Sequence, residues 1–218
     1  MRIGIIGAGH IGGTLVRRLA AVGHDVEVAN SRGPDTLGDL ARETGVKAVT
    51  VEQAAKGKDV VVVTIPEKSV PRLPKDLLAD APETVVVDTG NYYPRQRDGR
   101  IDDIEGGTTE SRWVERQLGH PVVKAFNNIY AQHLLERGKP KGTKGRIALP
   151  VAGDDPRAKQ VVVDLLDQLG FDGVDAGSLD ESWRQQPATP VYGTDLDADG
   201  VRRALQEAKR ERTPEFRA

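Results

Sequence analysis

Short apolar runs alternate with longer amphipathic segments along most of this chain. Residues 59–65 are mainly valine and isoleucine, and residues 84–88 carry three further valines. Continuous apolar runs of this kind are typical of strands that are buried on both faces of a parallel sheet. A third run, residues 3–6, is followed by apolar residues at helical spacing, namely Leu15, Val16, Leu19 and Ala20. The alternation predicts an α/β protein with an open, mostly parallel sheet and helices on both of its faces.

The same pattern predicts the elements between these runs. Further helices are expected at 36–44, 51–55, 75–81 and 111–118, and further strands at 46–49 and 121–125. Thr50 is expected to cap the helix that follows it. The stretch 90–107 is rich in Gly, Arg and Asp and is predicted to be a loop.

After about residue 145 the strand, helix and strand pattern repeats. Strands are predicted at 146–152 and 171–175, with a helix at 155–169 between them, and we expect both strands to extend the main sheet. A polar helix is predicted at 201–212. Because too little chain remains for a second core, residues 181–218 are expected to form a C-terminal extension packed on a single domain of residues 1–180.

The first strand ends in a glycine-rich turn that leads directly into a helix. Gly7, Gly9 and Gly12 have the GxGxxG spacing of a dinucleotide site, and both flanking elements and a second strand are present. The glycines allow a tight turn, close approach of a pyrophosphate, and close packing of the helix on the strand. Backbone N–H groups at the helix start then face the phosphates. This context predicts a doubly wound Rossmann domain that binds a nicotinamide dinucleotide, with a purely structural turn as the alternative.

The end of the second strand indicates which dinucleotide is bound. An NAD site usually offers a carboxylate there, whereas an NADP site offers a basic group for the 2'-phosphate. This chain offers Asn30, Ser31 and Arg32, and no carboxylate at the tip. We therefore expect NADP(H) as the cofactor, bound by the domain of residues 1–180. The alternative is that Ser31 and Arg32 are solvated turn residues.

Polar side chains also follow the later strands, where a doubly wound sheet binds the nicotinamide half of its ligand. Thr64, Ile65 and Pro66 close one strand and are expected beside the nicotinamide, although Pro66 would end a strand in any case. Asp88 closes the next strand, where it would either orient a ribose or cap the following segment.

Candidate catalytic groups follow the strand at 121–125. Asn127 and Asn128 offer amides that can bind a carboxamide or the edge of a flat ring. Hydride transfer depends chiefly on orientation, and its accompanying proton comes from solvent or from a nearby donor. Tyr130 and His133 rank first among such donors because they follow the asparagines, and a structural role stays open for each. The other donors in this region are Lys124, Tyr92 and Tyr93.

Composition narrows the expected partners. The formal net charge is −2 and the basic residues are dispersed, which predicts neither a nucleic-acid nor a membrane partner. The chain has no cysteine, which excludes disulfides and thiolate chemistry, and its four histidines lack metal-ligand spacing, so no metal is expected. The sequence shows neither a signal-peptide pattern nor an apolar run of membrane-spanning length, so a cytoplasmic location is expected.

Several short motifs occur in a recognisable order: GAGHIGG, ANSRG, TIP, KAFNNI, LPVAGDD and DAGSL. Over residues 1–180 they resemble the deazaflavin-dependent NADP oxidoreductases, which pass a hydride between NADP(H) and coenzyme F420. KAFNN and VAGDD are also similar to the cytosolic NADPH-flavin domain of vertebrate membrane metalloreductases. The resemblance implies a homodimer and a small-molecule hydride acceptor, either F420 or a flavin. It assigns Gly7, Gly9, His10, Ile11 and Gly12 to the pyrophosphate, Ser31 and Arg32 to the 2'-phosphate, Thr64 and Pro66 to the nicotinamide side, and Ala125 and Asn127 to the border of the ring.

Two other functions stay open at this point. One is an NADPH-dependent reductase of a small carbonyl or imine compound, which would benefit from a positioned acid. The other is a non-catalytic NADPH-binding module that regulates a partner. The C-terminal segment departs from the deazaflavin pattern, because polar residues stand where that family has an apolar segment. Trp183, Gln186 and Tyr192 would then help to build a different acceptor pocket, or Trp183 would simply anchor the tail.

Overall fold

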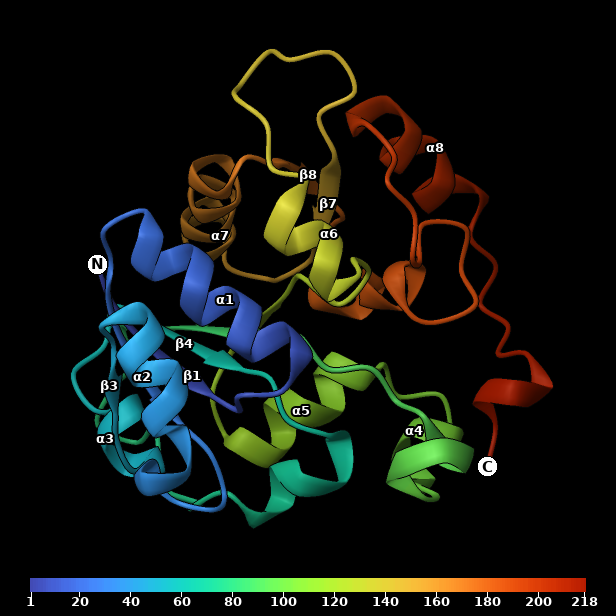
Figure 1. Ribbon diagram of the computed structural model, residues 1–218. Helices are drawn as coiled ribbons and strands as arrows, with labels where there is room; N and C mark the ends of the chain where they lie inside the picture. The colour runs from blue at the N-terminus through green and yellow to red at the C-terminus, as the bar shows by residue number, and fades with distance from the viewer.

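The computed structural model describes residues 1–218 and contains a central sheet of six parallel strands in the order β3-β2-β1-β4-β5-β6 (Figure 1). The strands are β1 (Arg2–Ile6), β2 (Asp25–Ala29), β3 (Lys47–Ala48), β4 (Val60–Val63), β5 (Val85–Asp88) and β6 (Val122–Lys124). The strand order reverses between β1 and β4, which places a crevice outside the carboxyl ends of these two strands. The predicted α/β class and doubly wound parallel sheet are confirmed.

Helices cover both faces of this sheet. They are α1 (His10–Ala21), α2 (Gly38–Thr44), α3 (Val51–Ala55), α5 (Glu110–Leu118), α6 (Ala131–Glu136) and α7 (Pro156–Leu169). In β4, Val60 and Val62 belong to the core that contains α1 and α7, whereas Val61 and Val63 belong to the core that contains α3 and α5. Successive strand residues face opposite sides of a sheet, so a strand between two apolar cores requires an apolar residue at every position.

Some predicted helices and loops differ from the structure. Thr50 caps α3 as predicted, in a capping box with Gln53. Residues 75–81, predicted to be helical, form successive turns instead, because prolines at positions 71, 74 and 82 bracket a segment too short for a stable helix. The predicted loop 90–107 contains the π turn η3 (Pro94–Asp98) and the short helix α4 (Asp102–Glu105). The last helix, α8 (Ala198–Glu207), ends five residues before the predicted position.

The two later strands do not extend the main sheet, so that prediction was wrong. β7 (Ala148–Val151) and β8 (Asp172–Asp175) form a separate parallel sheet with α7 as their crossover. A single antiparallel bridge, between Lys124 and Ala152, joins this sheet to β6. Pro150 explains the break: a ladder from β7 to β6 would need its backbone N–H, which proline lacks. The side chain of Gln185 bonds to the carbonyl oxygen of Pro150 instead, at 3.3 Å.

The last part of the chain packs on the second sheet and on the carboxyl edge of the first. Val201 and Leu205 of α8 share a core with Ala148 and Val174 of the second sheet. The chain enters this region through the 3-10 turn η4 (Leu179–Gln185) and continues after α8 to η5 (Pro214–Phe216). In Figure 1 this segment runs down the side of the molecule past α4. None of the helices is both long enough and apolar enough to cross a bilayer.

The packing of α3 on β1 generates a stability prediction. A Cβ on Gly4 would lie 1.6 Å from the carbonyl oxygen of Ala54, so Gly4→Ala forces the helix off the strand. We expect this overpacking to lower the free energy of unfolding by about 1–3 kcal/mol or more, measured by urea denaturation. Gly38→Ala is the control, because Gly38 has ordinary helical angles and a Cβ there would make only an ordinary contact, 3.5 Å from the guanidinium of Arg42; it should be neutral or stabilising. Equal stability of Gly4→Ala and the wild type would contradict this packing.

Candidate functional site

A cavity of about 600 Å³ lies at the carboxyl edge of the sheet, where the strand order reverses. The ends of β1, β2 and β4 and the 3-10 turn η2 (Glu67–Arg72) contribute to its wall. Its lining includes the predicted cofactor residues Gly7, Gly9, Asn30, Ser31, Arg32, Thr64, Ile65 and Pro66. Open α/β sheets bind their ligands in this crevice. Three motifs that are far apart in the sequence therefore meet in one cavity, which we call the nucleotide cavity.

The three glycines of the turn differ in their steric surroundings. Gly7 has a φ of +112°, and a Cβ there would lie 2.3 Å from the carbonyl oxygen of Thr64. A Cβ on Gly12 would lie 2.0 Å from the carbonyl oxygen of Gly7, so α1 packs directly on the turn. Gly9 has no atom within 4 Å of the position of a Cβ. The turn is thus tight at Gly7 and Gly12 and leaves open space at Gly9, as close approach of a pyrophosphate requires.

The start of α1 is suited to an anion. Its N-cap, Gly9, has no side chain that could accept a hydrogen bond, and the first turn contains no acidic residue. The backbone N–H groups of His10, Ile11 and Gly12 have no partner inside the helix, and the positive end of the helix dipole lies behind them. Gly12 itself is buried, and the side chain of His10 lines a neighbouring hollow together with Arg32.

The loop after β2 is held by Asn30 and presents Arg32. The Asn30 side chain accepts a hydrogen bond from the backbone N–H of Arg32 at 2.9 Å and donates one to Thr36 Oγ1 at 2.9 Å. Asn30 therefore shapes the loop, while Ser31 and Arg32 are exposed in the lining of the cavity. The guanidinium group of Arg32 has no acceptor within the chain, which leaves it available to a phosphate.

Arg72 is a second cation of the nucleotide cavity, and the sequence analysis missed it. It is the last residue of η2 and lines the same cavity as Arg32, which lies forty residues earlier in the chain. The only signal for it in the sequence is a basic residue between prolines, after the strand that ends at Thr64-Ile65-Pro66. Nothing local distinguishes it from a solvated loop residue.

Asp88, predicted to contact a ribose or to cap a segment, lies in a buried ion network outside the lining of the nucleotide cavity. Its carboxylate accepts hydrogen bonds from Lys124 Nζ at 3.0 Å, Ser111 Oγ at 2.7 Å and the backbone N–H of Gly90 at 2.8 Å. The side chains of Asp88 and Lys124 are 2% and 0% exposed. Burial alone would lower the pKa of Lys124, but the surrounding carboxylates, Asp88 first, raise it above its usual value. The pair links the ends of β5 and β6.

Glu67, directly after Pro66, is a further buried acid that the sequence did not reveal. Its side chain is fully buried against Gly90, and neither carboxylate oxygen has a hydrogen-bond partner within the chain. Burial raises the pKa of Glu67 well above its usual value, the neighbouring Asp88 raises it further, and Lys124 opposes this. The carboxyl groups of Glu110 and Asp98 face it as well. Glu67 therefore favours its neutral, protonated form.

Asn127 is part of a buried amide network. Its Nδ2 donates to Asn91 Oδ1 at 3.0 Å and to the carbonyl oxygen of Gln185 at 2.7 Å, and its Oδ1 accepts from Gln185 Nε2 at 3.0 Å. Ala125 is also buried, and Phe126 between them has a φ of 62°, which is uncommon for a residue with a side chain. Neither Ala125 nor Asn127 lines the nucleotide cavity. The network holds the loop after β6 against Asn91, which follows β5, and against Gln185 of η4.

Tyr130 and His133 lie at the start of α6, outside the nucleotide cavity. Tyr130 is 59% exposed and its ring meets that of His133 edge-on, with 5.4 Å between the ring centres. Nδ1 of His133 lies 2.9 Å from an oxygen of Asp195. Tyr130 also lies against Gly193, next to Tyr192, whose hydroxyl contacts that of Tyr93. Burial, followed by contact with Tyr93, raises the pKa of Tyr192.

Comparison with known proteins gives several similarities. Residues 2–92 match a family described as NADP oxidoreductase coenzyme F420-dependent. The F420-dependent NADP reductase of Methanothermobacter thermautotrophicus is 30% identical over 213 residues, covering 88% of this chain and 87% of that protein. The metalloreductase STEAP3 of Rattus norvegicus is 27% identical over 191 residues, covering 87% of this chain and 36% of that protein. Both resemblances predicted from the motifs are confirmed.

Two further similarities concern proteins whose names state no activity. The protein YjhV of Escherichia coli is 51% identical over 71 residues, or 33% of this chain, and the chain spans 52% of its length. The crystal structure of the hypothetical protein SMa0349 from Sinorhizobium meliloti has 32% sequence identity and a TM-score of 0.75. That match covers 90% of this chain and 95% of the other, so the same architecture extends over nearly the whole molecule.

The free guanidinium of Arg32 generates a binding prediction. We expect Arg32→Ala to weaken NADPH binding about tenfold or more and to leave NADH binding nearly unchanged, because only NADPH carries the 2'-phosphate. Titration calorimetry with both nucleotides measures this. Arg42→Ala, which removes an exposed arginine paired with Asp39 on α2, is the matched control. Equal losses for the two nucleotides would show that Arg32 does not recognise the extra phosphate.

The buried carboxyl of Glu67 generates a pH prediction. The folded state binds a proton that the unfolded state releases between about pH 4.5 and the raised pKa, so this residue lowers the stability of the wild type as pH rises through that window. We expect Glu67→Gln to gain stability relative to the wild type by about 1.4 kcal/mol for each pH unit within it. Urea denaturation from about pH 5 to about pH 8 tests this. Glu83→Gln, at an exposed glutamate, is the control, and parallel profiles for Glu67→Gln and the wild type would refute the assignment.

Proposed function

The chain belongs to the family of coenzyme F420-dependent NADP oxidoreductases, and from that premise we propose that it transfers a hydride between NADPH and a flat flavin-like or deazaflavin-like acceptor. One observation carries the proposal. The glycine turn, the Arg32 loop and the Thr64-Ile65-Pro66 segment line a single cavity at the reversal of strand order. Family membership supports the NADP-dependent redox chemistry, and the chemistry of the strand ends favours the class of acceptor.

The cavity suggests how the nucleotide would be bound. The open space at Gly9 and the free N–H groups at the start of α1 would receive the pyrophosphate. Arg32 would bind the 2'-phosphate, with Arg72 as a second cation of the same cavity. Thr64 and Pro66 would border the nicotinamide half. Bound NADPH supplies the hydride, and the protein contributes orientation and exclusion of water.

The titratable groups near the strand ends favour an acceptor that needs no protein acid. Lys124 and Asp88 are paired and buried, and Glu67 is buried behind Gly90. His133 is paired with Asp195, which leaves the exposed Tyr130 as the accessible hydroxyl. A flavin-like ring can take its proton from water, whereas reduction of a carbonyl or imine benefits from a positioned acid. We propose in addition that the acceptor ring lies near Tyr130 and His133, on the side of the Asn127 network, and takes its proton from water.

An anaerobic assay tests the proposal. Purified protein is mixed with NADPH and, in turn, F420, FMN, FAD and a panel of carbonyl and imine compounds, and the nicotinamide absorbance is followed. We expect NADPH to be consumed with F420 or a flavin, two electrons passing to the acceptor while it takes up one proton from water. NADPH binding without consumption by any acceptor would instead indicate a binding module.

Gly9→Ala is the matched variant for this assay. A Cβ at Gly9 meets no atom of the protein, so the variant should fold with unchanged stability, yet the methyl group occupies the space proposed for the pyrophosphate. We expect it to lose NADPH binding and turnover together. If Gly9→Ala retained full turnover, the pyrophosphate would not lie at this turn.

A further inference from the structure

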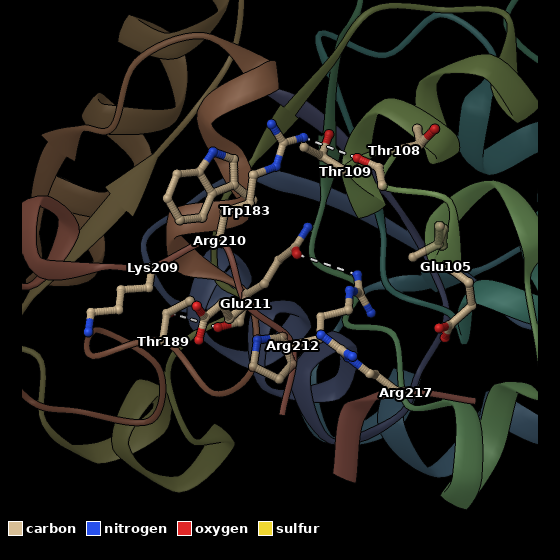
Figure 2. A pocket seen from close by; sticks show the side chains of 14 residues that line it. Glu105, Thr108, Thr109, Trp183, Thr189, Lys209, Arg210, Glu211, Arg212 and Arg217 are labelled. Atoms are coloured by element: carbon tan, nitrogen blue, oxygen red, sulfur yellow. Dashed lines mark hydrogen bonds between the residues drawn. The ribbon is translucent and has the colours of Figure 1, made fainter. Parts of the chain in front are cut away.

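A second cavity, of about 420 Å³, lies between the segment that follows α8, the turn η4 and the start of α5. It shares no lining residue with the nucleotide cavity. We call it the arginine pocket, because Arg210, Arg212 and Arg217 line it. In Figure 2, Arg212 and Arg217 reach the pocket across from Trp183 and Arg210.

The positive charge of the arginine pocket is only partly compensated. Arg212 pairs with the buried Glu110 at 3.0 Å. Arg210 donates only to the carbonyl oxygen of Gly107, at 3.1 Å, and the guanidinium of Arg217 has no acceptor within the chain. The lining carries four cationic and two carboxylate side chains, and the buried Glu110 adds a third carboxylate behind Arg212, which leaves an excess of one positive charge.

The wall of the pocket also contains a buried donor without an acceptor. Gln186 is 7% exposed, and its Oε1 accepts from Arg212 Nη2 at 3.4 Å. Because a guanidinium offers only donors, the amide oxygen must face Arg212, and the amide nitrogen is turned away from it. That nitrogen, Nε2, has no hydrogen-bond partner. An unsatisfied buried donor of this kind requires an explanation, and a bound acceptor that it would meet after a small shift of the side chain is one.

Trp183 adds a flat wall that is flanked by cations. The guanidinium carbon of Arg184 lies 4.4 Å from the centre of its rings, and that of Arg210 lies 6.0 Å away. Stacking of this kind limits the positions that Arg210 can adopt and keeps its charge at the pocket. The other tryptophan, Trp113, is buried in the core beneath the sheet. Trp183 is therefore the tryptophan that a ligand in this pocket would contact.

We propose that the arginine pocket binds a small anion that carries at least two negative charges on phosphate or carboxylate oxygens. Such a ligand only accepts hydrogen bonds. The pocket offers it guanidinium groups, the Gln186 amide, and the hydroxyls of Thr108 and Thr109, alongside the carboxylates of Glu105 and Glu211. The proposal goes beyond hydride transfer, because the pocket is separate from the nucleotide cavity and does not require nucleotide to be bound there.

Fluorescence titration tests the proposal. Inorganic pyrophosphate and citrate are added separately to the full chain at constant ionic strength, and Trp183 emission is recorded. We expect a saturable change with at least one of them, and about fivefold weaker binding in Arg217→Gln, because an arginine forms charge-assisted bonds to an oxyanion. Arg203→Gln is the matched control, since it removes one positive charge from an exposed position on the neighbouring helix α8, outside the lining of the pocket. Tighter binding of pyrophosphate identifies a phosphate ligand, and tighter binding of citrate a carboxylate ligand.

Three results would overturn the proposal. Absence of saturable binding of either anion, checked by calorimetry, is the first. The second is an equal loss in Arg203→Gln and Arg217→Gln, which would indicate a general charge effect of the C-terminal region. The third is loss of binding in Arg32→Ala, which would place the anion at the nucleotide cavity. Gln186→Glu provides an independent test, because it preserves the side-chain volume, replaces the unpaired donor with a carboxylate, and should abolish anion binding. Circular dichroism of each variant verifies that it is folded.

Discussion

The buried ion pair of Lys124 and Asp88 holds the carboxyl edge of the sheet together. Charges without access to water are costly unless they are paired and hydrogen-bonded, and here the carboxylate also accepts bonds from Ser111 and from the backbone of Gly90. The backbone of Lys124, moreover, forms the bridge to Ala152 that attaches the second sheet. The side chain and the backbone of Lys124 thus join β5, β6 and the second sheet at the edge where ligands of this fold bind.

Near this pair, the groups that can bind phosphates and the buried titratable groups lie in different parts of the carboxyl edge. The nucleotide cavity presents backbone N–H groups and exposed arginines, which need no burial to attract phosphates. The region at the ends of β5 and β6 contains titratable groups that are buried, namely Glu67, Asp88 and Lys124. This separation suits the hydride transfer proposed above, which depends on orientation and not on a buried acid of the protein.

The sequence was sufficient for features whose physical cause is local. The strands of valine, the glycine turn and the capped helix after Thr50 each depend on neighbouring residues, and the absence of a carboxylate after β2 could be read directly. Features that depend on contacts between distant segments were missed or misjudged. Asp88 was expected either to orient a ribose or to cap the following segment. Only the fold shows that its carboxylate accepts from the backbone N–H of Gly90 and is also paired with Lys124. The sequence shows that Pro150 has no backbone N–H. Its effect on the pairing of β7 could be predicted only with knowledge of which edge of β7 faces β6.

The hydrogen bonds of Gln185 have a consequence for how the protein folds. Its amide reaches Asn127, the carbonyl oxygen of Lys124 and the carbonyl oxygen of Pro150, so it finishes an edge whose strands were all translated earlier. Domains generally fold as units rather than strand by strand. The loop after β6 is therefore secured only when η4, 58 residues further along the chain, is available to pack against it.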